Sequence, residues 1–463
     1  MSENKSGGTS RRDFLKSTGT IAVASAVAGM AIPRVHAAED NTINVALIGC
    51  GGRGTGAAAD AMSVNRGPVK LIAMADVFED RLTGSYNNLS KQFGDKMDVP
   101  QDRKFIGFDA YQKAMDCLKP GDIAIFASPL AFRWVHFGYA IQKGLNVFME
   151  KPVTADGPTS RRMLQLADES VAKNLKVGVG LMSRHSRALQ ELQKRIQDGE
   201  IGDIVLMRAY RMTGPVGSAF SEKWPGQPNE LLWQLRRFHS FIWASGGCFN
   251  DFYIHVIDHC CWMKNAWPVK AQAVGGRHYR MSPDGKPAID QNFDAYSVEY
   301  TFADGAKLIC DGRCIAGCEN IYSSYAHGTK GSAVVSKAGD CGPPSSIYKD
   351  QSLSSASKTW ESDIAPDQRN PYQNEWNDLV EAIRNDKPYN EARRGVEASV
   401  VSSLGRKAAH TGVEITYDAM LNSPEDYAPG ADKFTMDSPA PVKCDAEGKY
   451  PIPMPGILTD KEY

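Results

Sequence analysis

INVALIGCGGRGTGAAADAM, residues 43–62, places an apolar run, a cluster of glycines and an alanine-rich segment in direct succession. The run at 43–49 is aliphatic and lies between polar residues, a pattern typical of a buried parallel strand. The alanine-rich segment favours a helix. The sequence therefore predicts a strand, a glycine turn and a helix, which is the context that the dinucleotide-binding fingerprint requires.

The glycines have the spacing of that fingerprint, Gly49-x-Gly51-x-x-Gly54. Gly49 permits the tight turn, Gly51 lets the backbone approach a pyrophosphate, and Gly54 lets the helix pack closely on the strand. Gly52 and Arg53 lie within the same turn and are expected to contact the cofactor with them. The free N–H groups and the dipole of the helix amino terminus favour phosphate binding there.

A second apolar run, VKLIAMAD, ends at Asp76, 22 residues beyond Gly54. A carboxylate at the end of the second strand accepts hydrogen bonds from ribose hydroxyls and repels a 2′-phosphate. This favours NAD as the cofactor over NADP. The alternative is that Asp76 caps the helix that follows.

A further strand, helix and strand are predicted between residues 122 and 150, with the helix ending at Gly144. Strands that alternate with helices predict a doubly wound parallel sheet, on which ligands bind beyond the carboxyl ends of the strands. The residues expected at those ends are Ser128, Pro129, Glu150 and Lys151.

The segment from Asp122 to Thr154, closing with GLNVFMEKPV, resembles the Gfo/Idh/MocA oxidoreductase family, of which glucose-fructose oxidoreductase and inositol dehydrogenase are familiar members. The stretches 199–211, 327–335 and 405–418 are similar to that family's second domain. The resemblance implies that Lys151 faces the nicotinamide and a substrate hydroxyl, and that the Lys151–Pro152 peptide is cis. Without it, a lysine in a Glu-Lys-Pro tripeptide is by default a surface residue of a turn.

A second catalytic segment is predicted at 245–263, where Asp251, His255 and Asp258 stand at i, i+4 and i+7 and would share one helix face. An aspartate one turn from a histidine can accept its N–H and stabilise the imidazolium, so that the histidine acts as a general base. The family carries D-x-x-x-H here, often with glycine where this chain has Tyr253, which is expected to narrow or reshape the substrate pocket. For Asp258 and for His259 we expect structural roles.

The substrate side is predicted at 224–243, which is rich in Trp, Arg and Gln and includes Arg237. Aromatic faces and arginine forks suit a sugar ring, and the same residues suit a subunit interface, so both interpretations stand. Arg184 and His185 are weaker candidates for the same pocket.

The remaining pattern predicts a second α/β domain with an open, mostly antiparallel sheet, whose strands include 205–211, 295–302 and 306–312. A helix at 374–385 is expected to cover that sheet, and an open sheet face favours a homo-oligomer. Seven prolines after residue 422 predict an extended arm. The predicted divisions are a signal peptide at 1–37, an NAD-binding Rossmann domain at 38–183, a substrate and oligomerisation domain at 184–422, and an arm at 423–463.

Composition limits the partners. The 463 residues include 53 basic and 54 acidic side chains, a balance that argues against binding to nucleic acid or to a membrane surface and favours a small neutral substrate. The ten cysteines include no CxxC pair, so we expect core thiols and no metal. The amino terminus, with SRRDFLK at 10–16 and VHA at 35–37, resembles a twin-arginine signal cleaved after Ala37, which predicts a folded protein exported to the periplasm.

These observations predict an exported enzyme with a tightly held dinucleotide. In the first hypothesis it oxidises a secondary hydroxyl of a sugar or polyol, with Lys151 and His255 managing the proton. In the second it is an NAD-dependent glycoside hydrolase that works by transient oxidation and elimination. A third hypothesis, from a different class, is a non-catalytic sugar-binding or sensing protein.

Overall fold

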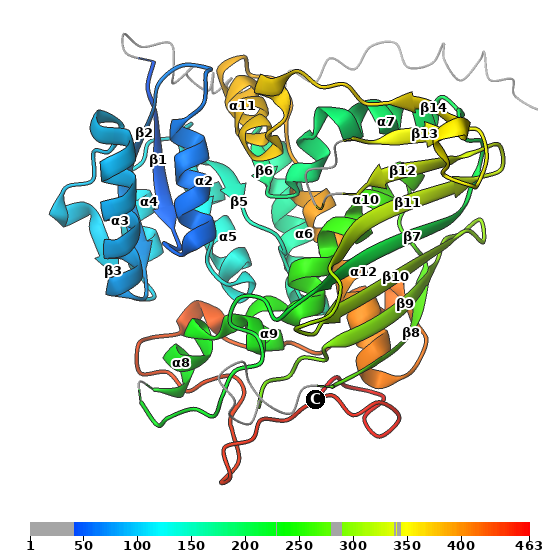
Figure 1. Ribbon diagram of the computed structural model, residues 1–463. Helices are drawn as coiled ribbons and strands as arrows, with labels where there is room; N and C mark the ends of the chain where they lie inside the picture. The colour runs from blue at the N-terminus through cyan, green and yellow to red at the C-terminus, as the bar shows by residue number, and fades with distance from the viewer. Residues whose placement is uncertain (1–40, 228, 279–288, 338, 340–343) are drawn as a thin grey trace, which may run out of the picture.

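The computed structural model describes residues 41–227, 229–278, 289–337, 339 and 344–463, and these contain two β-sheets with helices packed on them (Figure 1). The predicted signal peptide lies outside the described residues. Within them, no helix combines the length and apolar character needed to span a bilayer.

The first sheet is parallel and lies at the left of Figure 1, with strand order β3-β2-β1-β4-β5-β6. Its strands are β1 (Ile43–Ile48), β2 (Val69–Asp76), β3 (Lys104–Ile106), β4 (Ile123–Phe126), β5 (Asn146–Met149) and β6 (Val177–Val179). The helices α2 (Gly52–Met62), α3 (Glu79–Phe93), α4 (Ala110–Asp116), α5 (Arg133–Lys143) and α6 (Gly157–Ala172) connect them. The predicted doubly wound Rossmann sheet is therefore confirmed.

The second sheet has nine strands in the order β14-β13-β12-β11-β7-β10-β9-β8-β15. It is mostly antiparallel, as predicted, because only β7 (Ile204–Thr213) and β10 (Lys307–Cys314) pair in parallel among its neighbours. The others are β8 (Lys270–Gly276), β9 (Ala295–Thr301), β11 (Ile321–Gly328), β12 (Ser332–Ser336), β13 (Ser346–Tyr348), β14 (Lys358–Glu361) and β15 (Ile415–Thr416). The helices α10 (Ile254–Lys264) and α12 (Ala392–Thr411) pack against it.

The helix predicted to cover this second sheet packs elsewhere. That helix, α11 (Pro371–Arg384), contacts α2 and β6 of the parallel sheet. Its Trp376 is fully buried, with its ring centroid 4.5 Å from that of Phe148 on β5. The prediction was wrong because an amphipathic pattern identifies the apolar face of a helix and not the sheet that the face will cover.

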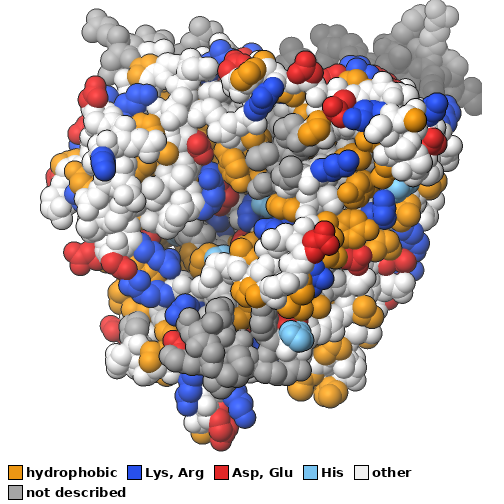
Figure 2. Space-filling view, in the orientation of Figure 1, with side chains coloured by type: hydrophobic (Ala, Val, Ile, Leu, Met, Phe, Trp, Pro, Cys, Tyr) orange, Lys and Arg blue, Asp and Glu red, His pale blue; other side chains and the backbone are white. Residues whose placement is uncertain are grey.

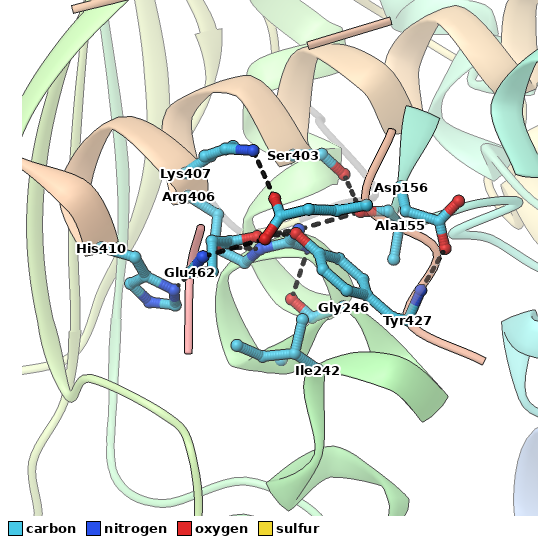
Figure 3. Close-up of polar contacts among 12 residues, drawn as sticks. Ala155, Asp156, Ile242, Gly246, Ser403, Arg406, Lys407, His410, Tyr427 and Glu462 are labelled. Atoms are coloured by element: carbon cyan, nitrogen blue, oxygen red, sulfur yellow. Dashed lines mark hydrogen bonds and ion pairs between the residues drawn. The ribbon is translucent and has the colours of Figure 1, made fainter. Parts of the chain in front are cut away.

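The carboxyl-terminal arm folds back along the body of the protein (red in Figure 1). Its penultimate residue, Glu462, is completely buried and accepts two hydrogen bonds from Arg406 of α12, at 2.9 and 2.8 Å (Figure 3). His410 Nδ1 lies 2.9 Å from the same carboxylate. This network fixes the end of the chain to the helix that covers the second sheet.

Nine cysteines fall among the described residues, and all nine are free thiols. Six of them are buried, which agrees with their predicted use as small core side chains.

Candidate functional site

A cavity of about 770 Å³ lies beyond the carboxyl ends of the parallel strands. It is bounded on its other side by the segment 235–255, which leads into the second sheet's helices. In Figure 2 the surface is hollowed near the centre, with Lys or Arg and His side chains visible around the hollow. The volume is within the range of small-molecule sites.

The glycine turn forms one end of this cavity. Gly49 has φ +97°, and a Cβ there would lie 2.6 Å from the backbone of Ala127. A Cβ on Gly54 would lie 2.0 Å from the carbonyl oxygen of Gly49, so this helix and strand touch as predicted. A Cβ on Gly51 or Gly52 would meet no protein atom within 4 Å. The space beside these two glycines is open to the cavity, which fits the approach of a pyrophosphate to the first turn of α2.

Asp76 lines the cavity at the end of β2. Its carboxylate accepts the backbone N–H of Cys50 at 2.7 Å and that of Phe78 at 2.9 Å. Burial raises the pKa of Asp76, and these donors offset only part of that effect. Asp76 does not occupy the N-cap position of α3, which is Phe78, so the alternative role as a cap is not the observed one.

Arg53 crosses from the glycine turn to the end of β5. Its Nε donates to Glu150 Oε1 at 2.5 Å, and its guanidinium lies 4.7 Å from the ring centroid of Tyr372. Burial would lower the pKa of Arg53, but the Glu150 carboxylate outweighs it and the net shift is upward. This ion pair fixes the Arg53 guanidinium beside the glycine turn.

Ser128 and Pro129 follow β4 and line the cavity as predicted from their position. The fully buried Arg133 shapes this turn by donating to the carbonyls of Phe126 at 2.6 Å and Ser128 at 3.1 Å. Ser128 Oγ lies 3.2 Å from His136 Nδ1. Burial lowers the pKa of His136 to about 3, so its imidazole is neutral.

Lys151 and Asp251 meet at the other end of the cavity. The Lys151–Pro152 peptide is cis, as the family resemblance implied. Lys151 Nζ donates to the carbonyl oxygen of Asp251 at 2.6 Å and lies 3.3 Å from its Oδ1. Burial would raise the pKa of Asp251, but Lys151 and His239 outweigh it and hold that pKa well below its usual range. The Asp251 carboxylate is therefore ionised.

His255 also lines the cavity, but the predicted pairing with Asp251 differs from the observed contacts. Asp251 Oδ2 lies 3.2 Å from His239 Nε2, and the buried His255 Nδ1 has no hydrogen-bond partner among the described residues. The reason is local: residues 249–253 form a π-helical turn, so positions 251 and 255 are not stacked as they would be on a regular α-helix. Burial, followed by the nearby Lys151 charge, lowers the pKa of His255 well below its ordinary value.

Helix α8 (Glu230–Arg236) contributes Leu235 to the cavity lining. Arg236 forms a two-pronged ion pair with Asp80 of α3, at 2.7 and 2.9 Å. Its guanidinium also lies 4.1 Å from the ring centroid of Phe78, a residue of the cavity lining. Both sides of the cavity are thus joined at the Asp76 end.

Three weaker candidates lie outside the cavity lining formed by the described residues. Arg184 forms a buried bidentate ion pair with Asp258, at 2.8 and 2.7 Å, which accounts for both side chains. Arg237 is half-buried and does not reach the lining. Tyr253 is fully buried and its hydroxyl contacts Cys314 Sγ at 3.6 Å, so it fills the core behind the site instead of narrowing the pocket. The structure thus does not bring these three side chains to the cavity.

Three further residues near the predicted site, His185, Trp243 and His259, have structural partners. His185 lies between Asp378 and Glu391, at 2.8 and 3.1 Å, outside the described cavity lining. The buried Trp243 donates from Nε1 to Gln234 Oε1 at 2.7 Å. His259 is fully buried, with Nδ1 3.1 Å from Ser324 Oγ.

Sequence reasoning missed several lining residues, including Phe78, Arg81, His136, His239 and Tyr372. His239 stands inside the Trp- and Arg-rich segment 224–243, where a histidine is itself a signal of a functional site. Tyr372 belongs to α11, and no local pattern ties that helix to this cavity.

Residues 189–334 match the family profile described as the GFO/IDH/MocA C-terminal domain. This match supports the assignment of the chain to the Gfo/Idh/MocA family. A curated relative, inositol 2-dehydrogenase of Corynebacterium glutamicum, is 26% identical over 118 residues, which are 25% of this chain and 34% of the relative. The match thus spans about a third of the length of that curated protein.

Solved structures resemble the chain more extensively. The scyllo-inositol dehydrogenase of Lactobacillus casei, determined with NAD(H) and scyllo-inositol, is 20% identical with a TM-score of 0.57, covering 81% of this chain and 99% of that chain. A levoglucosan dehydrogenase determined with NADH and levoglucosan is 18% identical with a TM-score of 0.60, at the same coverage. At these identities the likeness establishes the two-sheet fold.

Proposed function

We propose that this chain is a Gfo/Idh/MocA oxidoreductase that uses NAD to oxidise a secondary hydroxyl of a sugar or polyol. One observation carries the proposal: a continuous cavity is lined both by the glycine turn with Asp76 and by Lys151, Asp251 and His255. The related scyllo-inositol and levoglucosan dehydrogenases, solved with NAD(H) or NADH, support the cofactor and substrate class.

The residues at the Lys151 end can manage the proton of an alcohol. NAD, when bound, accepts a hydride from the carbinol carbon. Lys151 uses two of its three N–H donors on Asp251, at 2.6 and 3.3 Å, which leaves one for a substrate oxygen. His255 is neutral because its pKa is lowered, so one nitrogen of its imidazole is available to accept a hydrogen bond from the substrate hydroxyl.

Residues around the Asp76 end would hold the dinucleotide. The open space beside Gly51 and Gly52 suits the pyrophosphate, and Asp76 Oδ1 and Oδ2 suit the ribose hydroxyls of NAD better than a 2′-phosphate. The Arg236–Asp80 ion pair connects α8 to α3 beside this end of the cavity.

The test begins with protein purified without added nucleotide. Denaturation followed by chromatography identifies any nucleotide that it carries. Addition of NAD with myo-inositol, glucose or other polyols should then produce NADH absorbance. Absence of a nucleotide requirement and of any alcohol-dependent NADH would contradict the proposal.

The glycoside hydrolase remains the second candidate, because the same hydride transfer, if returned within one cycle, would permit elimination of an aglycone. Many turnovers of p-nitrophenyl glycosides without external NAD would select it. Absence of activity with both alcohols and glycosides, together with sugar binding measured by calorimetry, would support the hypothesis of a non-catalytic sensing protein.

We also propose that residues 1–37 direct export through the twin-arginine machinery to the periplasm, and that the exported protein is a homo-oligomer. The arginine pair and small residues before position 38 support export, and exposed apolar side chains on the second sheet, including Val205 and Val274, support association. Fractionation of wild-type protein and an Arg11→Lys/Arg12→Lys variant tests the first point, and light scattering tests the second.

A further inference from the structure

His239 is held rigidly in the wall of the cavity. Its Nδ1 accepts the backbone N–H of Ser218 at 3.1 Å, and its ring stacks on Phe252 with centroids 5.4 Å apart and planes 20° apart. Gly217 has φ +58°, and a Cβ there would lie 2.5 Å from His239 Cε1. The backbone therefore approaches the ring edge as closely as a glycine allows.

These contacts decide which nitrogen carries the proton. Because Nδ1 accepts a backbone N–H, a neutral His239 has its hydrogen on Nε2. Nε2 lies 3.2 Å from Asp251 Oδ2 and can donate to it. The other oxygen of the same carboxylate lies 3.3 Å from Lys151 Nζ.

The three side chains form a series of contacts that leads from the cavity wall to the Lys151 amine. All three are nearly buried, with side-chain exposures of 14% for His239, 13% for Asp251 and 15% for Lys151. Asp251 belongs to the π-helical turn at 249–253, and the rotation of its carboxylate determines where Oδ1 meets the amine. The Nε2–H of His239 fixes that rotation from the opposite side.

We propose that His239 is a positioning residue that acts on Lys151 through Asp251, an inference that rests on the oxidoreductase function proposed above. By donating to Asp251 Oδ2, His239 keeps Oδ1 at contact distance from the Lys151 amine. The remaining N–H of Lys151 then points at the substrate oxygen. A purely structural His239, retained for its stack on Phe252, would have no effect on the amine.

Two substitutions separate these roles. The amide of His239→Gln reaches the place of Nε2 and can still donate to Asp251, whereas the amide of His239→Asn reaches only the place of Nδ1. We expect His239→Asn to lower kcat by about tenfold to a hundredfold, because the Lys151 amine would be misplaced relative to the reacting atoms. His239→Gln should restore kcat to within about threefold, because the donor to Asp251 is retained.

A double-substitution cycle tests the route through Asp251. Asp251→Asn should lower activity on its own. Adding His239→Asn should cause little further loss, because both changes interrupt the same series of contacts. Losses that multiply independently would overturn the proposal. So would equal activities for His239→Asn and His239→Gln.

A measurement without substrate or cofactor makes the inference independent of the enzyme assay. Acetic anhydride acetylates an amine that has released its proton, and mass spectrometry of the peptide containing Lys151 gives the rate. When the Asp251 carboxylate is no longer held, the amine loses its contact with Oδ1 and is less restrained, so His239→Asn should be acetylated several times faster than the wild type and His239→Gln should not. An unchanged rate in His239→Asn, with the wild-type fold shown by circular dichroism, would overturn the proposal even if no substrate is found.

If His239→Asn does not fold, Gly217→Ala displaces the ring without changing it, and the same acetylation result is expected. Failure of the proposed function would look different. Wild-type protein would then show no alcohol-dependent NADH, while the acetylation rates would still differ between the variants.

Discussion

Arg53 Nε lies 2.5 Å from Glu150 Oε1, and this ion pair ties the glycine turn to the strand end that carries Lys151. Behind it, Glu375 of α11 is buried, and neither of its carboxylate oxygens has a hydrogen-bond partner among the described residues. Burial, followed by the charge of Glu150, raises the pKa of Glu375 well above its ordinary value. The folded protein therefore keeps this side chain protonated at a pH where the unfolded chain would release the proton.

Glu375 should make stability decrease as pH rises. Because its pKa in the folded state is raised, the folded state binds more protons than the unfolded state above about pH 4.5, and the free energy of unfolding falls there. Glu375→Gln removes this contribution, so its loss of stability between pH 5 and pH 8 should be smaller than that of the wild type by about 1 kcal/mol or more. Urea denaturation at each pH measures it. Glu381→Gln, at a more exposed site of the same helix, should keep the wild-type dependence, and equal slopes in all three proteins would refute the prediction.

His185 should add a second pH dependence. Burial lowers its pKa, but Glu391 and Asp378 outweigh burial and raise it to about 8. The stabilisation is complete below about pH 6.5 and is lost as pH rises through 8, a loss of about 2 kcal/mol. His185→Gln should remove that loss in thermal or urea unfolding between pH 6 and 9. His327→Gln is the matched control, and a wild-type profile in His185→Gln would contradict the assignment.

Asp76 should control the choice of dinucleotide. Asp76→Asn keeps one oxygen that can accept the N–H of Cys50 or of Phe78, and it removes the charge that repels a 2′-phosphate. The preference for NADH over NADPH should fall by about tenfold, or 1.4 kcal/mol, in fluorescence titrations. Asp95→Asn, which changes an exposed carboxylate just beyond α3, should leave the ratio unchanged. An unaltered ratio in Asp76→Asn would place the ribose elsewhere.

Lys151→Met should abolish most activity and leave the affinity for the nucleotide nearly unchanged. The lost donor contributes about 10²- to 10⁴-fold to the rate in comparable proton-handling groups. The affinity for NADH should change by less than about threefold, because the glycine turn and Asp76 are untouched. Lys143→Met on the surface of α5 is the control. Retention of more than a tenth of wild-type kcat would exclude Lys151 from the reaction.

Glu462 should contribute to the stability of the whole protein although it is the penultimate residue. Removing its carboxylate leaves the fully buried guanidinium of Arg406 without its anionic partner (Figure 3). Loss of one partner of a buried ion pair costs about 3–5 kcal/mol, so Glu462→Ala should unfold at a markedly lower urea concentration. Lys461→Ala, at the exposed neighbouring position, should not. A Glu462→Ala change below about 1 kcal/mol would show that the arm is not held by this pair.

Local sequence patterns determined much of the fold of this protein and the position of its cavity. The spacing of Gly49, Gly51 and Gly54 and the position of Asp76 after β2 predicted the parallel sheet and one end of its cavity, because turn geometry and strand ends depend on neighbouring residues. The Glu150-Lys151-Pro152 tripeptide located the other end, since it follows a buried strand directly.

Only the tertiary structure decided the partners of those residues. The helical spacing of Asp251 and His255 suggested that they pair, yet the π-helical turn directs Asp251 to Lys151 and His239, which lie 100 and 12 positions away in the chain. In the same way, the amphipathic pattern of α11 gave no indication that this helix would bring Glu375 and Tyr372 to Arg53. Periodicity specifies which face of a segment is apolar or polar, whereas the opposing surface is set by how the whole chain packs.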